Sequence, residues 1–382
     1  MNDARRWQVV AALALTAVLA ATQSAGAAIV RVIPRDGPGE GFNDATPVAA
    51  VGGNSGTTLG AQRRVALEYA AQIWASRLVS PVEIRVSATF DALACSAGST
   101  TLGVAGPVSV FRDFSGAPRA NTFYPSALAD RLAGTDMEPS EDDIDATFNS
   151  AFGSTCAFPA GWYYGLVGAA ADGDSDFVTV ALHELGHGLG FLALLDVESG
   201  ALFEGRDDAF LLQLIDARSG RTLDAMTNAQ RRSALEATGS LRFIGPQVTA
   251  SSGGVVSGVD TLGRVEMYAP AFAQNGSTAS HWSNEVAPLE LMAPFFEAPL
   301  HDPGLAVAAL GDLGWELAGA PGCAGDCDGG GSVTIDELVV AVRIALGEAE
   351  VAACTAVDSG GDGRVSIADV VAAFSGALAG CR

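Results

Sequence analysis

The stretch that decides the fold is VTVALHELGHGLGF, residues Val178–Phe191. It contains the pattern HExxH, formed by His183, Glu184 and His187. Residues four positions apart lie above one another on one face of an α-helix, so the two histidines can offer imidazole nitrogens to the same metal ion. Glu184 lies beside them and can reach a water molecule at that metal. The stretch therefore predicts a helix with two zinc ligands and a carboxylate that acts as a general base.

The residues around the motif favour a buried helix that ends soon after His187. A bare HExxH also occurs in ordinary helices, so the motif alone is a hypothesis. Here the helix is apolar, and the chain has only four histidines. Glycine weakens a helix and permits a turn, and two glycines follow the motif closely. The apolar positions and these glycines are Val178, Val180, Ala181, Leu185, Gly188 and Gly190.

A catalytic zinc site usually has three protein ligands and keeps one position open for water. The longer pattern HExxHxxGxxH has its glycine at Gly190, but its third histidine is replaced by Ala193, which cannot bind a metal. A third ligand must therefore come from another segment. The candidates are the two remaining histidines and two carboxylates that would follow the gluzincin plan: His281, His301, Glu204 and Asp207.

Two downstream segments make the chain resemble the leishmanolysin family of metzincin zinc proteases. In that family the third histidine stands in an HW pair shortly before an LMAP turn, and here His281-Trp282 precedes Leu291-Met292-Ala293-Pro294. The resemblance implies that His281 completes the zinc site and that Met292 packs beneath the metal without binding it. It covers roughly Thr58–Leu317. The chain departs from the family in its shorter length, its few cysteines and the lack of a recognised propeptide.

Periodicity and the resemblance together predict an α+β fold. Apolar residues at helical spacing, after a capping threonine, predict a helix over Thr58–Leu78. Alternation predicts a strand over Val82–Phe90, and Ile144–Phe148 is a further strand candidate. The resemblance implies a metzincin-like protease domain over residues 28–319. This domain is expected to have a mixed twisted sheet beside the active-site helix and a mostly irregular or helical C-terminal half.

The N-terminus has the features of a secretory signal peptide. Arg5 and Arg6 precede the apolar run Trp7–Ala21, and Ala25-Gly26-Ala27 fits the cleavage rule for small residues. We therefore expect residues 1–27 to be removed on export and the mature protein to be secreted. The apolar run is short for a spanning helix, so we expect no membrane association of the mature form.

Charge and cysteine content restrict the partners and the compartment. The formal net charge of −23 argues against nucleic acid and anionic membranes as partners. The six cysteines suit disulfides in an exported protein. Pairing within the first part of the chain and within its end is the simplest expectation, and three connectivities are open for the last four cysteines. The cysteines are Cys95 and Cys156, then Cys323, Cys327, Cys354 and Cys381.

Residues 320–382 contain two related loops that resemble the calcium loops of EF-hand and dockerin modules. Each loop precedes an apolar stretch at Leu338–Leu346 or Val370–Leu378, which predicts a small α-helical domain. Both loops lack some of the usual acids, which indicates weak binding of one or two calcium ions. The resemblance to dockerins also implies a cohesin-type protein partner. The expected calcium ligands are Asp326, Asp328, Ser332 and Glu337, then Asp358, Asp362 and Asp369.

These patterns predict a secreted zinc endopeptidase that hydrolyses peptide bonds in a protein or peptide substrate, with one catalytic zinc ion and Glu184 as the base. One alternative is a non-catalytic adhesin or binding module on a degenerate protease fold, with a calcium-dependent attachment tail. A second alternative is a gluzincin-like aminopeptidase, in which Glu204 or Asp207 would replace His281 as a ligand.

Overall fold

The computed structural model describes most of the chain. The expected signal peptide lies outside the described residues except for Ala27, and so do Cys323 and Cys381. The described residues are 27–157, 160–170, 173–295, 298–318, 324–327, 333–359 and 364–379.

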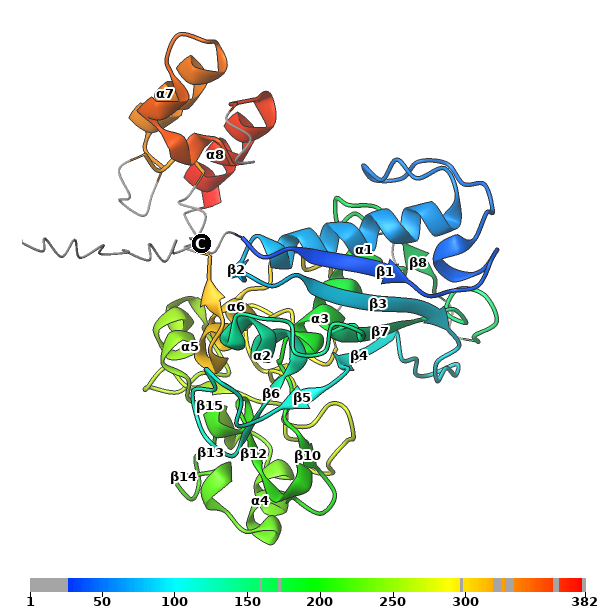
Figure 1. Cartoon of the computed structure of the whole chain (residues 1–382), viewed down its shortest axis with the longest axis vertical. Helices are drawn as coiled ribbons and strands as arrows, with labels where there is room; N and C mark the ends of the chain where they lie inside the picture. Colours follow the sequence, from blue (N-terminus) through cyan, green and yellow to red (C-terminus); the bar gives the residue numbers. More distant parts are fainter. Residues whose placement is uncertain are drawn as a thin grey trace, which may run out of the picture.

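A four-stranded mixed sheet forms the centre of the N-terminal half (Figure 1). Its order is β1-β3-β7-β4, in which the first three strands are parallel and β4 is the antiparallel edge strand. The predicted mixed sheet and the α+β class are thus confirmed. The edge strand is not predicted from the sequence, because its glycines and proline show no apolar alternation. The strands are β1 (Val30–Pro34), β3 (Ile84–Asp91), β4 (Gly103–Pro107) and β7 (Ile144–Asn149).

Two helices, α1 (Leu59–Ala75) and α3 (Phe177–Gly188), pack on one another and against this sheet. As predicted, Thr58 caps α1, because its side chain accepts a hydrogen bond from the Ala61 N–H. The helix ends before the predicted Leu78, which instead belongs to the short strand β2. The Trp74 indole of α1 donates to the Leu182 carbonyl of α3 at 2.9 Å and joins the two helices.

The larger part of the chain, residues 27–318, has a C-terminal half that consists of short elements. A mostly irregular or helical half was expected, but a four-stranded sheet of order β14-β13-β15-β16 is also present. The reason is length, since strands of two or three residues are too short to show alternation. These strands are β13 (Leu214–Asp216), β14 (Arg221–Thr222), β15 (Leu241–Phe243) and β16 (Val265–Glu266). Besides α1 and α3, residues 27–318 contain the helices α2 (Ser126–Ala133), α4 (Asn228–Leu235), α5 (Pro246–Ser251) and α6 (Leu305–Leu313).

The remaining strands pair in small sheets of two or three. They are β2 (Leu78–Val79), β5 (Val110–Phe111), β6 (Thr122–Pro125), β8 (Trp162–Tyr163), β9 (Ser175–Asp176), β10 (Leu195–Asp196), β11 (Ala201–Leu202), β12 (Asp207–Asp208) and β17 (Glu316–Leu317).

The tail contains two helices, α7 (Ile335–Ala345) and α8 (Ile367–Ala379), at the places where apolar stretches predicted them. They share a hydrophobic cluster of their own, separate from the core of the larger part (Figure 1). Each expected group of cysteines supplies one described disulfide, Cys95–Cys156 and Cys327–Cys354. Among the described residues, no helix combines the length and apolar character needed to span a bilayer.

Candidate metal centre

Helix α3 holds the HExxH motif in the interior, and all of its residues are buried. It begins at Asp176, whose carboxylate caps the helix by accepting a hydrogen bond from the Thr179 N–H at 2.8 Å. Gly188 lets the helix approach β7 closely, since a Cβ there would lie 2.3 Å from an Ile144 side-chain carbon. The chain then turns at Gly190, whose φ of 121° favours glycine. The two glycines expected to end the helix thus serve packing and turning, respectively.

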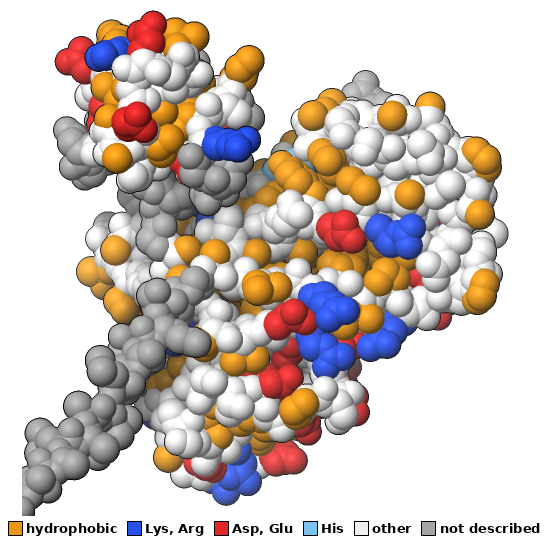
Figure 2. All heavy atoms as spheres, turned by 45° about the horizontal axis from the view of Figure 1, so that its top comes forward, with side chains coloured by type: hydrophobic (Ala, Val, Ile, Leu, Met, Phe, Trp, Pro, Cys, Tyr) orange, Lys and Arg blue, Asp and Glu red, His pale blue; other side chains and the backbone are white. Residues whose placement is uncertain are grey.

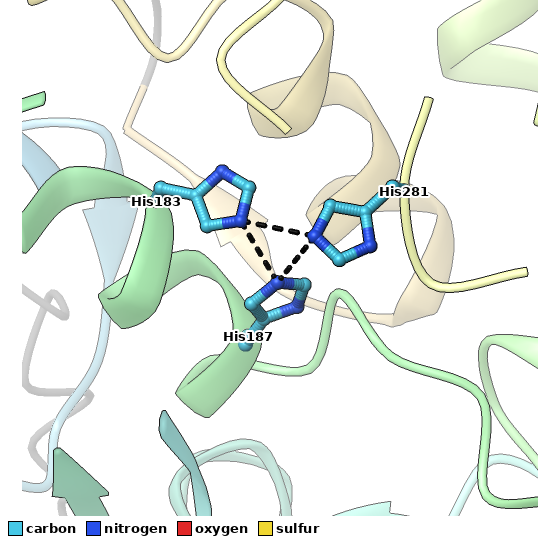
Figure 3. Close-up of side chains that lie close together, drawn as sticks. All are labelled: His183, His187 and His281. Carbon is cyan, nitrogen blue, oxygen red and sulfur yellow. Dashed lines mark hydrogen bonds between the residues drawn. The ribbon is translucent and has the colours of Figure 1, made fainter. Parts of the chain in front are cut away.

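Three histidines converge at one point. His183 and His187 lie one helical turn apart on α3, and His281 comes from a segment 94 residues beyond His187 (Figure 3). Their Nε2 atoms are separated by 3.1 Å between His183 and His187, 3.0 Å between His183 and His281, and 3.2 Å between His187 and His281. Within the described part of the chain, this is the one group of three or more His, Cys, Asp or Glu side chains arranged to hold a metal ion.

Backbone carbonyls determine which ring nitrogens carry protons. The Nδ1 atoms lie 2.8 Å from Leu291 O for His183, 2.7 Å from Phe191 O for His187 and 2.9 Å from Ser277 O for His281. A carbonyl oxygen only accepts, so each Nδ1 carries the proton, and the Nε2 of a neutral ring then has a lone pair and no proton. The three Nε2 atoms therefore cannot hydrogen-bond to one another.

Burial keeps the three rings neutral. It lowers the pKa of His183 to about 4 and that of His187 to about 3, and the neighbouring His183 lowers the latter further. Burial also brings the pKa of His281 well below its usual value, with smaller effects from the other two histidines. Neutral imidazole is the form that binds metals. The site is thus ready to bind without losing protons.

The donor set fits a divalent transition metal. Three unprotonated Nε2 lone pairs that face one another at 3.0–3.2 Å are favourable only with a cation between them. Three nitrogens at tetrahedral positions around zinc, at the usual bond length, would be about 3.3 Å apart. The observed spacing agrees with that value to within about 0.3 Å. The carbonyl partners of the Nδ1 atoms are the kind that orient histidine ligands in metal sites. The geometry shows a site that could hold a metal ion.

The segment that carries Met292 packs against the helix α3, which holds the HExxH motif. Met292 is fully buried, and a Cβ at Gly186, which lies between the two motif histidines, would be only 2.7 Å from the methionine sulfur. The Trp282 N–H donates to the Met292 carbonyl at 2.8 Å, which ties this turn to the segment of His281. Met292 is thus a packing residue against α3.

Glu184 lies on α3 between the two motif histidines and is 6% exposed. Burial raises the pKa of its carboxyl to about 8, while a hydrogen bond from the backbone N–H of Ala105 in β4 acts in the opposite direction. A cation at the neighbouring histidines would also favour the ionised form. The Glu184 side chain is therefore enclosed by the protein.

The other candidates for the third ligand, His301, Glu204 and Asp207, lie elsewhere in the structure. The His301 Nε2 is 2.7 Å from an Asp176 carboxylate oxygen at the start of α3, and so joins this helix to the segment after Met292. Glu204 is exposed in a short turn, and Asp207 lies in β12 beside β6. None of the three belongs to the histidine group. The Ala193 N–H donates to the Ser280 hydroxyl at 3.1 Å. The missing histidine position of the longer motif therefore adjoins the segment that supplies His281.

The two tail loops repeat one hydrogen-bonding pattern. The Glu337 carboxylate accepts from the N–H groups of Cys327 and Thr334, both at 2.7 Å. The Asp369 carboxylate accepts from the N–H groups of Ser359 at 3.1 Å and Ser366 at 2.7 Å. The positions correspond with a shift of 32 residues (327 to 359, 334 to 366 and 337 to 369). The described ends of the two loops therefore have the same local structure.

The expected calcium ligands of these loops are only partly described. Asp326, Glu337 and Asp369 are buried and Asp358 is half-buried, while Asp328, Ser332 and Asp362 lie outside the described residues. In the described part of the tail, no three acidic side chains converge on one point. Calcium binding stays a prediction.

Sequence reasoning missed the backbone groups of this centre. The carbonyls that orient the histidines belong to the main chain, so no side-chain pattern in the sequence could indicate them. Only the spacing of His183, Glu184 and His187 could be recognised from neighbouring residues in the sequence. No protein-family model and no curated protein matches this chain.

Proposed function

We propose that this chain is a secreted zinc-dependent endopeptidase of the leishmanolysin type. The observation that carries the proposal is the convergence of three buried, neutral Nε2 atoms on the helix face where Glu184 is also buried. Catalytic zinc sites typically use three protein ligands and leave a further position for water. The HExxH motif and the downstream segments with His281 and Met292 support the same assignment.

Each residue has a definite role in this proposal. His183, His187 and His281 would hold the zinc ion, each in the neutral tautomer that its carbonyl partner imposes. A zinc ion bound there would supply Lewis-acid chemistry and lower the pKa of a water molecule. Glu184 would act as the general base that takes a proton from the attacking water and as the acid that returns it to the leaving amine. The enclosed position of Glu184 strengthens its electrostatic interactions, because the surrounding dielectric constant is low.

Casein hydrolysis by the purified mature chain tests the proposal. We expect cleavage that is inhibited by 1,10-phenanthroline and restored by zinc. Glu184→Gln keeps the shape of the side chain but removes the base, and should reduce the rate by at least about 10²-fold. Its zinc content should equal that of the wild type. A folded, zinc-loaded wild type that cleaves neither casein nor a mixed peptide library would contradict the proposal.

The non-catalytic alternative predicts a different result. An adhesin or binding module on a degenerate fold has no need for zinc, so the mature chain would contain little of it and would cleave nothing. A gluzincin-like aminopeptidase would depend on Glu204 or Asp207, which lie outside the histidine group. Zinc content and cleavage of Glu204→Gln and Asp207→Asn variants separate this second alternative from ours.

For the tail we propose weak calcium binding and a role as an attachment module. Both helices expose apolar side chains at corresponding positions, with Ile335 79% and Val339 54% exposed on α7, and Ile367 82% and Val371 58% exposed on α8. Figure 2 shows orange hydrophobic side chains on the outside of this unit. Such a surface suits a protein partner of the cohesin type. Titration of the mature chain with calcium, beside Glu337→Gln and Asp369→Asn, tests the calcium part.

A further inference from the structure

Strand β4 places main-chain groups next to the base of the proposed reaction. It pairs only with β7, so one edge of the strand is free of sheet partners among the described residues. The Asn149 N–H donates to Leu102 O, and the Val108 N–H donates to Asp143 O, both at 2.9 Å. Because bonding alternates along an antiparallel strand, the even-numbered residues of β4 bond to β7 and the odd-numbered ones point away.

Ala105 is one of the odd-numbered residues, so its main-chain groups point to the side of the strand that has no sheet partner among the described residues. Pro107 is also an odd-numbered residue, so the N–H that proline lacks is not needed for the hydrogen bonds between β4 and β7. The side chains of β4 alternate in the same way, so positions 103 and 105 share one face of the strand. That face is turned toward α3, since Ala105 packs against the core.

Gly103 leaves the space that Glu184 fills. A Cβ at position 103 would lie 2.8 Å from Glu184 Cγ, 2.9 Å from one carboxylate oxygen and 3.0 Å from the carboxyl carbon. These distances are below van der Waals contact, so the Glu184 side chain or β4 would have to move. The backbone angle of Gly103 is not in the left-handed region. The absence of a side chain, rather than backbone freedom, is what this position requires.

We propose that Gly103 is a positioning residue for the general base. It lets the Glu184 carboxylate lie against β4, in the space that a side chain at position 103 would fill. The inference rests on the proposed protease function for its kinetic consequence, but the contact itself does not. The chain also offers a matched control: Gly106 lies in the same strand, has no positive φ, and has nothing within 4 Å of an added Cβ.

Steady-state kinetics with a fluorogenic peptide give the first test. A displacement of about 1 Å at a reacting group can reduce the rate by roughly 10²-fold. We therefore expect Gly103→Ala to lower kcat by about 10- to 100-fold, with KM and zinc content unchanged. Gly106→Ala should keep the wild-type kcat. A Gly103→Ala enzyme with the kcat of the Gly106→Ala control would overturn the proposal.

A double-mutant cycle of thermal unfolding gives a test that needs no enzymatic activity. In the full mature chain, we expect Gly103→Ala to lower Tm by about 2–4 °C, because the added methyl group overlaps the Glu184 side chain. In a Glu184→Ala background the contact is absent, so adding Gly103→Ala should leave Tm unchanged. Equal Tm shifts in the two backgrounds would show that the residues are not coupled, and would overturn the proposal.

The two tests also separate this inference from the proposed function. Coupled Tm shifts in a chain that cleaves no peptide would overturn the protease proposal and support the contact between Gly103 and Glu184. Suppose instead that the wild type cleaves peptides, that the Tm shifts are not coupled and that Gly103→Ala keeps the wild-type kcat. This result would support the protease proposal and overturn the contact between Gly103 and Glu184.

Discussion

At the scale of single residues, His281 and His301 give a sharp contrast. The Nε2 of His281 lies 3.0 Å from that of His183, whereas His301 pairs with Asp176. We therefore expect His281→Ala to lose most of its zinc on dialysis, because two ligands hold zinc far less tightly than three. His301→Ala should keep its zinc. Atomic absorption on the two dialysed variants measures the difference, and equal zinc contents would show that His281 is not a ligand.

Met292 allows a test of packing beneath the metal centre. Its side chain is fully buried against Gly186. Met292→Ala should reduce the free energy of unfolding by about 2–5 kcal/mol, since it leaves a cavity. Met292→Leu, which conserves volume, should cost less than about 1.5 kcal/mol. Urea unfolding measures both. A loss for Met292→Ala no greater than that for Met292→Leu would argue against tight packing.

At the scale of elements, the start of α3 depends on Asp176. Its carboxylate accepts from the Thr179 N–H and hydroxyl and contacts His301. Asp176→Ala removes the cap, which costs about 0.5–2 kcal/mol, and leaves buried donors without partners, which costs about 1–3 kcal/mol more.

The matched variant Asp176→Asn retains a side-chain oxygen for the cap and loses only the charge that faces His301. We expect its free energy of unfolding to lie between those of Asp176→Ala and the wild type. Denaturant unfolding of the three proteins provides the comparison. If Asp176→Ala unfolds at the wild-type midpoint, the cap does not stabilise α3.

Elements differ in how far the sequence reveals them. Helix α3 follows from the apolar spacing around His183 and His187, because a helix has a fixed local period. Strand β4 could not be foreseen, since Gly103–Pro107 is held by its partner β7 rather than by any pattern of its own. The four short strands of the second sheet could not be predicted either, because two or three residues are too few to show alternation.

At the scale of the whole molecule, a buried carboxyl pair makes stability depend on pH. Asp130 of α2 and Asp143, which precedes β7, are 3% and 7% exposed. Burial is the main reason that the pKa of Asp130 rises from 3.8 to about 7, and burial also raises the pKa of the neighbouring Asp143. The folded state therefore binds a proton that the unfolded state releases. Its stabilising effect is complete below pH 3.8 and is lost as pH rises through about 7.

Asp130→Asn should remove this dependence. An amide can donate to the Asp143 carboxylate at every pH, and its oxygen can still accept from the Met137 N–H. As the pH rises from 5 to 8, the wild type should lose more free energy of unfolding than the variant does. Urea unfolding at both values measures it. Parallel pH profiles would show that Asp130 is already ionised in the folded protein.

The sequence by itself determined the local features of this protein. The HExxH helix, the capping threonine of α1, the repeated tail loops and the α+β class follow from spacings within one element or one turn. These features depend on the chain's own periodicity, so neighbours along the sequence are sufficient to predict them.

Only the tertiary structure decided which distant groups meet. It brought His281 rather than His301, Glu204 or Asp207 to the two motif histidines, and it placed carbonyl oxygens behind all three rings. It also put Gly103 against Glu184. The physical reason is that packing of α3 against β4, β7 and the Met292 segment selects these contacts, and backbone groups and glycines take part without any side-chain signal in the sequence.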